Sequence, residues 1–240
     1  MVAVGVAAST RLPAGDRRAI VARGLSKRFR KGDVRALAGV DFHADSGSMT
    51  AVVGPSGSGK STLLYALSGL IELDAGTVEI DGVTPASAAD WVRLRSRHIG
   101  MVFQDDWLLN RLSAAENVEL PMIGVERSAR ARRARVQELL TRVNAGHFGD
   151  RMPAGLSGGE RQRIAIARSL ANRPKVMLAD EPTGELDSAN SRAIVELLAD
   201  LRAREGLTVV IVTHEDGIAA GCDRRFVLDD GRGRFVDRGG

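Results

Sequence analysis

A glycine-rich run that ends in lysine and serine is the most informative feature for chemistry. It follows the pattern glycine, any four residues, glycine, lysine, serine. Glycines let the backbone turn so that successive amide groups point into one concavity, which suits an anion. The helix expected next adds about half a positive charge at its first turn. The run therefore predicts a site for the phosphates of a nucleoside triphosphate, formed by Gly54, Pro55, Ser56, Gly57, Ser58, Gly59, Lys60, Ser61 and Thr62.

Two side chains of this run have separate expected tasks. Lys60 is expected to reach the β- and γ-phosphates, and the Ser61 hydroxyl is expected to bind Mg²⁺. The alternative is a glycine-rich turn that merely begins a helix. The complete spacing and the surrounding strand–loop–helix pattern favour the phosphate site.

Two adjacent acids supply the second part of the expected site. Asp180 and Glu181 follow residues 176–179, a short apolar run that is typical of a buried strand. Asp180 is expected to hold Mg²⁺, and Glu181 to orient or deprotonate the attacking water. Their roles differ because neighbours at a strand end point in different directions. An exposed turn acid is the alternative for Asp180, and the phosphate-binding run makes it the weaker one.

Alternating strands and helices must position these residues. After a strand-like stretch that opens at Ile20, the pattern predicts further strands at residues 49–53, 77–80, 99–103, 176–179 and 207–212. It predicts helices at residues 60–70, 129–143, 160–171 and 190–204. This alternation indicates an α/β fold with a parallel sheet covered on both faces, which binds ligands beyond the carboxyl ends of its strands.

Composition narrows the class of protein. The 240 residues are 44% apolar and 27% charged, which excludes intrinsic disorder for most of the chain. The single cysteine, Cys222, excludes a disulfide framework and a multi-cysteine zinc site within one chain. No apolar run approaches the roughly 20 residues that cross a bilayer. The net charge of +4 does not point to a nucleic-acid partner, and none is expected.

Residues 127–135 form the densest basic stretch, with five arginines. A patch for nucleic acid or lipid headgroups is one interpretation. The favoured interpretation is the solvated face of a helix whose other face carries the apolar side chains Val136, Leu139, Leu140 and Val143.

A third motif precedes an apolar helical run. By itself, Ser-Gly-Gly-Glu predicts a helix N-cap with free amides, a second possible anion site. Together with the phosphate-binding run before it and the acids after it, the motif resembles the signature motif of ABC-type ATPases. The resemblance covers about residues 20–230, and its signature positions are Leu156, Ser157, Gly158, Gly159 and Glu160.

The resemblance implies a division of the chain. Residues 1–18 are expected to form a flexible extension, and residues 19–240 one ABC ATPase domain. That domain would combine a P-loop NTPase core, whose sheet is mostly parallel, with an N-terminal antiparallel β-subdomain. A helical subdomain would be inserted at about residues 105–168.

Four further residues match family positions. Gln104 resembles the glutamine that contacts Mg²⁺ or the water and senses the membrane partner, and His214 the histidine that touches the γ-phosphate. Asp187 resembles the aspartate at the dimer seam. Phe29 falls where the family usually carries a tyrosine that stacks on adenine. A core or surface role is the alternative for each.

The implied function is that of an ATP-hydrolysing subunit that uses Mg²⁺. In this family two such subunits, identical or homologous, meet head to tail, so Ser157 and Gly159 would act on the partner's nucleotide. Binding and hydrolysis would drive a separate transmembrane permease, which places the chain in the cytoplasm on the inner face of the membrane. Arg161 departs from the glutamine of many members, and Glu185 from their asparagine or small residue; both would lie near the dimer seam.

Residues 37–40, 117–121 and 178–184 look most like the lipoprotein-releasing, macrolide-export and cell-division branch. A non-transport ATPase that regulates a cell-division or cell-wall complex through a membrane adaptor is therefore an alternative. A DNA-repair ATPase with a similar signature is disfavoured, because such proteins need a long coiled coil or zinc-binding cysteines.

Overall fold

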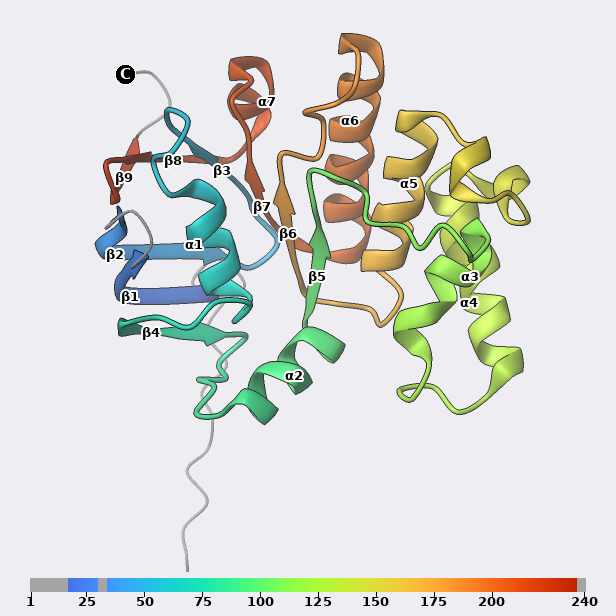
Figure 1. The fold of residues 1–240 in the computed structure, drawn as a ribbon, viewed down its shortest axis with the longest axis horizontal. Helices are drawn as coiled ribbons and strands as arrows, with labels where there is room; N and C mark the ends of the chain where they lie inside the picture. The colour runs from blue at the N-terminus through green and yellow to red at the C-terminus, as the bar shows by residue number, and fades with distance from the viewer. Residues whose placement is uncertain (1–16, 30–33, 237–240) are drawn as a thin grey trace, which may run out of the picture.

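The computed structural model describes residues 17–29 and 34–236. Most of the extension expected at residues 1–18 lies outside these residues, and the first strand begins at Arg18, two residues before the expected Ile20. The described chain forms two sheets with helices between and beside them (Figure 1). The predicted α/β fold with an antiparallel N-terminal sheet is confirmed.

The N-terminal sheet is antiparallel, with the strand order β2-β1-β4. Its strands are β1 (Arg18–Phe29), β2 (Val34–Asp45) and β4 (Ala75–Ile80). Alternation along β1 puts Ile20 and Ala22 on the covered face. A shift in the pairing register between Ala22 and Leu25 brings Leu25 onto that face as well, as a β-bulge does.

The six-stranded sheet has the order β5-β6-β7-β3-β8-β9. Its strands are β3 (Met49–Val53), β5 (Ile99–Val102), β6 (Val176–Asp180), β7 (Thr208–Val212), β8 (Arg224–Asp229) and β9 (Arg232–Val236). All pairs are parallel except β8 with β9, so five strands end at the same edge. That edge is where a ligand site is expected.

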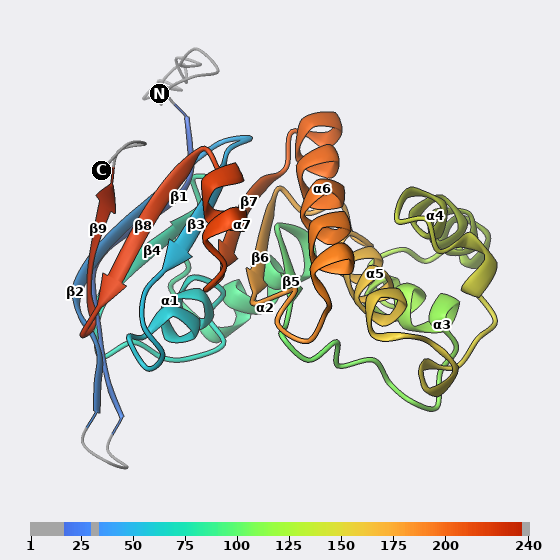
Figure 2. The same ribbon diagram turned by 90° about the horizontal axis from the view of Figure 1, so that it is seen from above.

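Helices cover both faces of this sheet. The described helices, of which α3 and α4 pack on α5 rather than on the strands, are α1 (Lys60–Leu67), α2 (Ala88–Arg97), α3 (Ala114–Glu119), α4 (Ala129–Arg142), α5 (Gly158–Ser169), α6 (Ser188–Glu205) and α7 (Asp216–Gly221), with 3-10 turns η1 (Leu120–Met122), η2 (Gly146–Phe148) and η3 (Pro153–Gly155). Helix α1 contacts strands of both sheets and lies between them (Figure 2).

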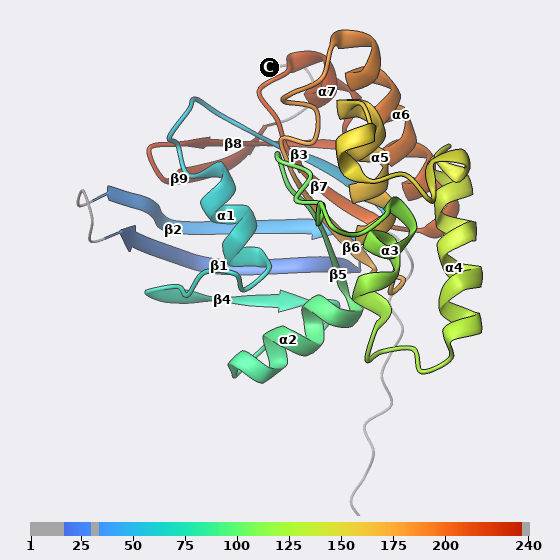
Figure 3. The ribbon, with the colours of Figure 1, turned by 45° about the vertical axis from the view of Figure 1, so that its right-hand side comes forward.

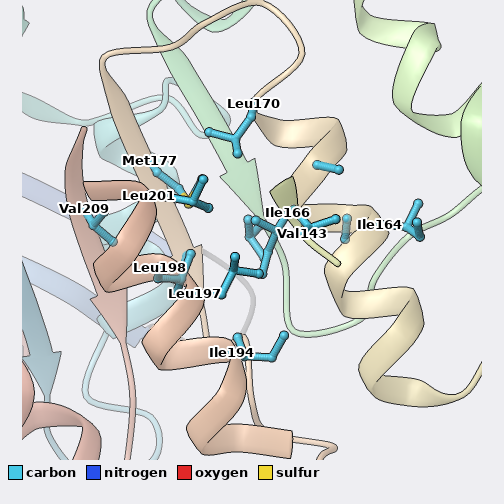
Figure 4. Packing of buried hydrophobic residues seen from close by; sticks show 14 of the residues in the cluster. Val143, Ile164, Ile166, Leu170, Met177, Ile194, Leu197, Leu198, Leu201 and Val209 are labelled. Carbon is cyan, nitrogen blue, oxygen red and sulfur yellow. The ribbon is translucent and has the colours of Figure 1, made fainter. Parts of the chain in front are cut away.

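Alternate side chains of the central strands enter two separate cores. Met177 and Val209 pack against α5 and α6, where Leu170, Leu197 and Leu201 meet them (Figure 4). Leu178 and Val210, one residue further along each strand, pack instead with α1 and the antiparallel sheet. Both faces of the strands are therefore buried, which explains their continuous apolar sequences.

Between β5 and β6 the chain holds only helices and loops. Helices α3 and α4 stand beside α5, away from the antiparallel sheet (Figure 3). This is the part of the chain that we predicted to form a helical subdomain. In residues 17–29 and 34–236, no helix is both long and apolar enough to span a bilayer.

Candidate active site

The phosphate loop, residues 54–62, connects β3 to α1 and fits closely between two neighbouring strands. Gly54 and Gly59 have φ angles of +153° and +102°. A Cβ at Gly54 would lie 1.9 Å from the Leu228 carbonyl oxygen, and a Cβ at Gly59 would lie 2.2 Å from that of Ala36. Neither position can accept a side chain without moving backbone, so these glycines fix the path of the loop.

The Lys60 ammonium folds back into this loop. Its Nζ donates to the carbonyl oxygens of Gly54 at 2.9 Å and of Pro55 at 2.8 Å. The side chain is buried, at 8% exposure. Because an ammonium carries three donors, one remains for an anion held in the loop. A buried positive charge at a helix N-terminus is an arrangement that attracts phosphate.

A second polar atom of the loop is buried without a partner. The Ser58 Oγ accepts and donates no hydrogen bond within the described residues, although it is fully enclosed. Buried polar atoms are normally paired, so an unpaired one inside a phosphate loop is consistent with a ligand that supplies the missing bond.

Ser61 and Asp180 meet across the junction of α1 and β6. The Ser61 Oγ donates to Asp180 Oδ1 at 3.0 Å. Burial raises the pKa of Asp180, while the Tyr65 and Ser61 hydroxyls and the Lys60 ammonium work in the opposite direction. The Ser61 hydroxyl on α1 and the Asp180 carboxylate at the end of β6 both offer oxygen atoms, the ligands that Mg²⁺ prefers.

Tyr65 is a neighbour of the site that sequence reasoning missed. It lies four residues after Ser61, so the two side chains share one face of α1. Burial and the neighbouring Asp180 carboxylate raise the pKa of Tyr65 to about 12, and the phenol stays neutral. The i, i+4 spacing from Ser61 was the available signal.

Glu181 and His214 come together because β6 and β7 are neighbours. The His214 Nδ1 lies 3.3 Å from Glu181 Oε2. Gln104 follows β5 on the other side of β6, and both its Nε2 and Glu181 Oε2 border Gly184, at 3.5 and 3.6 Å from the point where a Cβ of Gly184 would be. The three predicted catalytic side chains therefore gather at the edge that holds the phosphate loop.

The backbone at Glu181 is unusual for a residue with a side chain. Its φ angle is +42°. The Glu181 amide donates to the Val212 carbonyl at 3.0 Å, and the Glu181 carbonyl accepts from the Gly184 amide at 3.0 Å. Left-handed backbone outside glycine costs roughly 1–3 kcal/mol and occurs preferentially at functional sites.

The signature stretch, residues 156–160, begins α5 with a capping box. The Ser157 Oγ accepts from the Glu160 amide at 3.4 Å, and Glu160 Oε2 accepts from the Ser157 amide at 2.7 Å. This second bond lowers the pKa of Glu160. The helix starts at Gly158 rather than at the expected residue 160, and its first amides are thus partly satisfied.

The signature stretch and the phosphate loop lie apart in one chain. A Cβ at Gly159 would lie 3.0 Å from Asn190 Oδ1 on α6, and one at Gly158 would lie 3.3 Å from Leu186. Across the described ranges, no hydrogen bond or ion pair joins residues 156–160 to residues 54–62. Helix α5 packs in the core on one face of the six-stranded sheet and α1 in the core on the other (Figure 2).

Asp187 and Phe29 occupy the remaining predicted positions. Asp187 caps α6 by accepting from the amides of Ala189 at 3.0 Å and Asn190 at 2.9 Å, and the Asn190 bonds are the main cause of its lowered pKa.

The Phe29 ring, at the end of β1, is 39% exposed and has Lys27 Nζ 5.6 Å from its centroid. A ring exposed to this extent can stack on a base.

The basic stretch is mainly the solvated face that we predicted. Val136, Leu139, Leu140 and Val143 are all buried, as expected. Arg135 is the exception, because it is buried and donates Nη2 to the Leu170 carbonyl at 2.9 Å, at the C-terminus of α5. There its charge adds a second hydrogen bond to a carbonyl at the helix C-terminus, which also accepts from the Arg173 amide at 3.0 Å.

Comparison with known proteins identifies the family. Residues 37–184 match the family model for the ABC transporter. The lipoprotein-releasing system ATP-binding protein LolD 1 of Caulobacter vibrioides is 44% identical over 89% of this chain and 93% of its own length, and the LolD of Bacteroides thetaiotaomicron is 42% identical over 87% and 95%.

A solved structure agrees with these sequence relatives. The ATP-binding cassette MJ0796, in a dimeric post-hydrolysis state bound to ADP and Pi, superposes with a TM-score of 0.84 at 37% identity, over 92% of this chain and 99% of that one. The chain therefore belongs to the ABC transporter family. Within that family it is an ATP-hydrolysing, ATP-binding subunit that is similar to ATP-binding proteins of lipoprotein-releasing systems.

Proposed function

We propose that two copies of this chain close on ATP and drive a separate transmembrane permease of the lipoprotein-releasing type. The observation that carries the proposal is that the phosphate loop and the signature stretch are both well formed but apart. A second copy that faces the first in the opposite sense would bring its residues 156–160 to the phosphates held by residues 54–62. The dimeric form of the solved cassette supports this arrangement.

The phosphate loop would hold the triphosphate through its amides, Lys60 and Ser58. Phe29 would stack on the adenine, and its missing hydroxyl leaves that face intact. Ser61, Asp180 and Gln104 offer the oxygen atoms that would hold Mg²⁺, and the Ser61–Asp180 bond shows two of them already adjacent. The ion would neutralise phosphate charge and orient the γ-phosphate.

Glu181 would orient the attacking water and accept its proton. Its carboxylate lies at the strand edge, with His214 at 3.3 Å to fix its direction. Gln104 follows β5, on the other side of β6 from His214, and would help to hold the same water. Replacing bulk water by positioned groups of this kind is how phosphoryl-transfer enzymes gain rate.

Ser157 and Gly159 would contact the partner's γ-phosphate, with Asp187 at the seam between the copies. The close packing of Gly159 on Asn190 links the signature stretch to the helix that Asp187 caps. These two elements would therefore approach the partner together. ATP would be needed to complete the seam, because its phosphates carry the charge that joins the two surfaces.

The permease would dock in a groove of about 310 Å³ beside Gln104. Phe103, Trp107 and Pro121 line it, together with Arg168. The Trp107 ring is 65% exposed and stacks on Phe103 at 5.4 Å between centroids. A large exposed aromatic next to arginines is typical of an interface anchor. Docking there would hold the chain at the inner face of the membrane.

Affinity capture of the tagged chain from membranes tests this proposal. We expect a multi-spanning membrane protein to copurify with the wild-type chain and to be at least about tenfold depleted with Trp107→Ala, because an interface anchor contributes about 2 kcal/mol or more. Val34→Ala is the control, since Val34 is also exposed but begins β2 in the antiparallel sheet and does not line the groove.

Two results would count against the proposal. Equal recovery with Trp107→Ala and Val34→Ala would reject the groove as the docking site. Recovery of only a small membrane adaptor together with cell-wall enzymes would favour the regulatory alternative over transport.

A further inference from the structure

The segment that follows Gln104 is held firmly on helix α5. Arg161 donates Nε to Asp106 Oδ2 at 2.7 Å. Arg168 donates Nη2 to the Asp106 carbonyl and Nη1 to the Trp107 carbonyl, both at 2.6 Å. The two arginines are seven residues apart, about two turns, so they act from one face of α5.

Arg161 has a second partner in the signature stretch. Its Nη1 donates to the carbonyl oxygen of Leu156 at 3.0 Å. One planar guanidinium therefore connects Asp106 with the backbone immediately before α5. Asp106 is itself fixed, because its Oδ1 accepts from the Leu108 amide at 3.0 Å. A rigid fork can hold two acceptors in set directions, which a lysine ammonium cannot do in the same way.

The Asp106–Arg161 pair is partly buried and joins two segments that are far apart in the chain. The Arg161 side chain is 33% exposed and that of Asp106 23%. A single ion pair at this depth contributes about 1 kcal/mol to folding, whereas its planar geometry fixes the direction of both partners. The bridge therefore has its main effect on direction: it fixes how the first turn of α5 lies relative to the segment after Gln104.

We propose that Arg161 is a positioning residue for the composite nucleotide site, acting on the partner's ATP through Ser157 and Gly159. This inference rests on the proposed function. In this view Trp107 and the signature stretch move together as one rigid unit. A movement of the groove that contains Trp107 would then shift Ser157 while the phosphate loop stays in place. Arg161 itself touches no nucleotide.

The test uses the full chain carrying Glu181→Gln, in which ATP is retained. Sedimentation equilibrium measures ATP-dependent dimerisation, and calorimetry on the dilute monomer measures ATP binding. Arg161→Gln and Asp106→Asn are each expected to weaken dimerisation about tenfold, while monomer ATP affinity changes less than twofold. The double variant is expected to be no weaker than either single one, because all three remove the same interaction.

Two further variants complete the design. Arg161→Lys keeps the charge but not the fork, and is expected to recover only part of the loss. Arg204→Gln removes an exposed pair with Asp200 on α6 and is the control, with dimerisation unchanged.

Three results would overturn the inference. The first is a dimerisation constant within twofold of the Glu181→Gln parent in both Arg161→Gln and Asp106→Asn. That result would reject the role of Arg161 but not the proposed function. Another is full recovery by Arg161→Lys. The third is a parallel loss of monomer ATP binding and unfolding temperature, which would make Arg161 part of the scaffold. If the Glu181→Gln parent itself does not dimerise with ATP, the proposed function fails and the inference falls with it.

Discussion

Glu181→Gln is expected to abolish steady-state ATP hydrolysis while leaving ATP binding intact. Glutamine fills the same space and can still bond with His214, but it cannot accept a proton from the attacking water. Loss of a general base lowers the rate by about 10²–10⁴-fold. Release of inorganic phosphate measures turnover, and calorimetry measures the retained affinity.

The same substitution is expected to convert the protein into a stable dimer with ATP and Mg²⁺. The nucleotide that closes the dimer is no longer consumed, so the closed state accumulates. Glu196→Gln is the matched control, because it removes one negative charge from an exposed position on α6. A Glu181→Gln protein that hydrolyses ATP at more than about a tenth of the wild-type rate would remove Glu181 from its proposed role.

Lys60→Ala is expected to lose ATP binding by about 100-fold or more. The ammonium is buried inside the loop, where a charge-assisted bond from its remaining donor to phosphate contributes about 1.5–3 kcal/mol, and removing its positive charge weakens the attraction for the other phosphate oxygens as well. Titration with ATP in a calorimeter measures the loss. Thermal unfolding is the control for the fold, since the variant also frees the carbonyls of Gly54 and Pro55.

Undiminished ATP affinity in folded Lys60→Ala would reject the phosphate-site assignment. A variant that binds ATP normally but fails to dimerise would instead move Lys60 to the seam.

The parts of the site that lie within one short segment could be predicted from the sequence. The apolar run before Asp180 predicts a strand end, and β6 ends at that residue. The Ser157 cap follows in the same way from its spacing to Glu160. The apolar face of α4 was equally clear from periodicity, and its four predicted side chains are buried.

Contacts between distant segments needed the structure. His214 meets Glu181 because β7 lies beside β6. The order of the strands in a sheet cannot be read from the local amino-acid sequence. Asp106 and Arg161 are 55 residues apart, and nothing near either residue indicates the pairing. Tyr65 was missed because an aromatic residue at helical spacing is usually part of a core.

Several elements were not predicted, for identifiable reasons. The first half of strand β2 lacks the alternation expected of a strand and pairs with β1 through register shifts, although residues 40–45 alternate regularly. Strands β8 and β9 form the antiparallel edge of the sheet and are rich in arginine. Helix α2 buries only Leu94 and therefore shows almost no apolar period.

The composite site can be tested by mixing two inactive variants. Lys60→Ala disables the phosphate loop, and Ser157→Asp keeps a capping oxygen on α5 while placing a negative charge where a partner's phosphate would lie. Each variant alone is expected to be inactive. A dimer of one copy of each holds one intact site, built from the phosphate loop of one chain and the signature stretch of the other.

The ATPase rate of the equimolar mixture is therefore the most direct measurement of the central claim. With random pairing of symmetric subunits, half of the dimers are mixed and each has one of two sites, so about a quarter of the wild-type rate is expected to return. A mixture that never exceeds the summed rates of the two separate variants would show that each chain completes its own site.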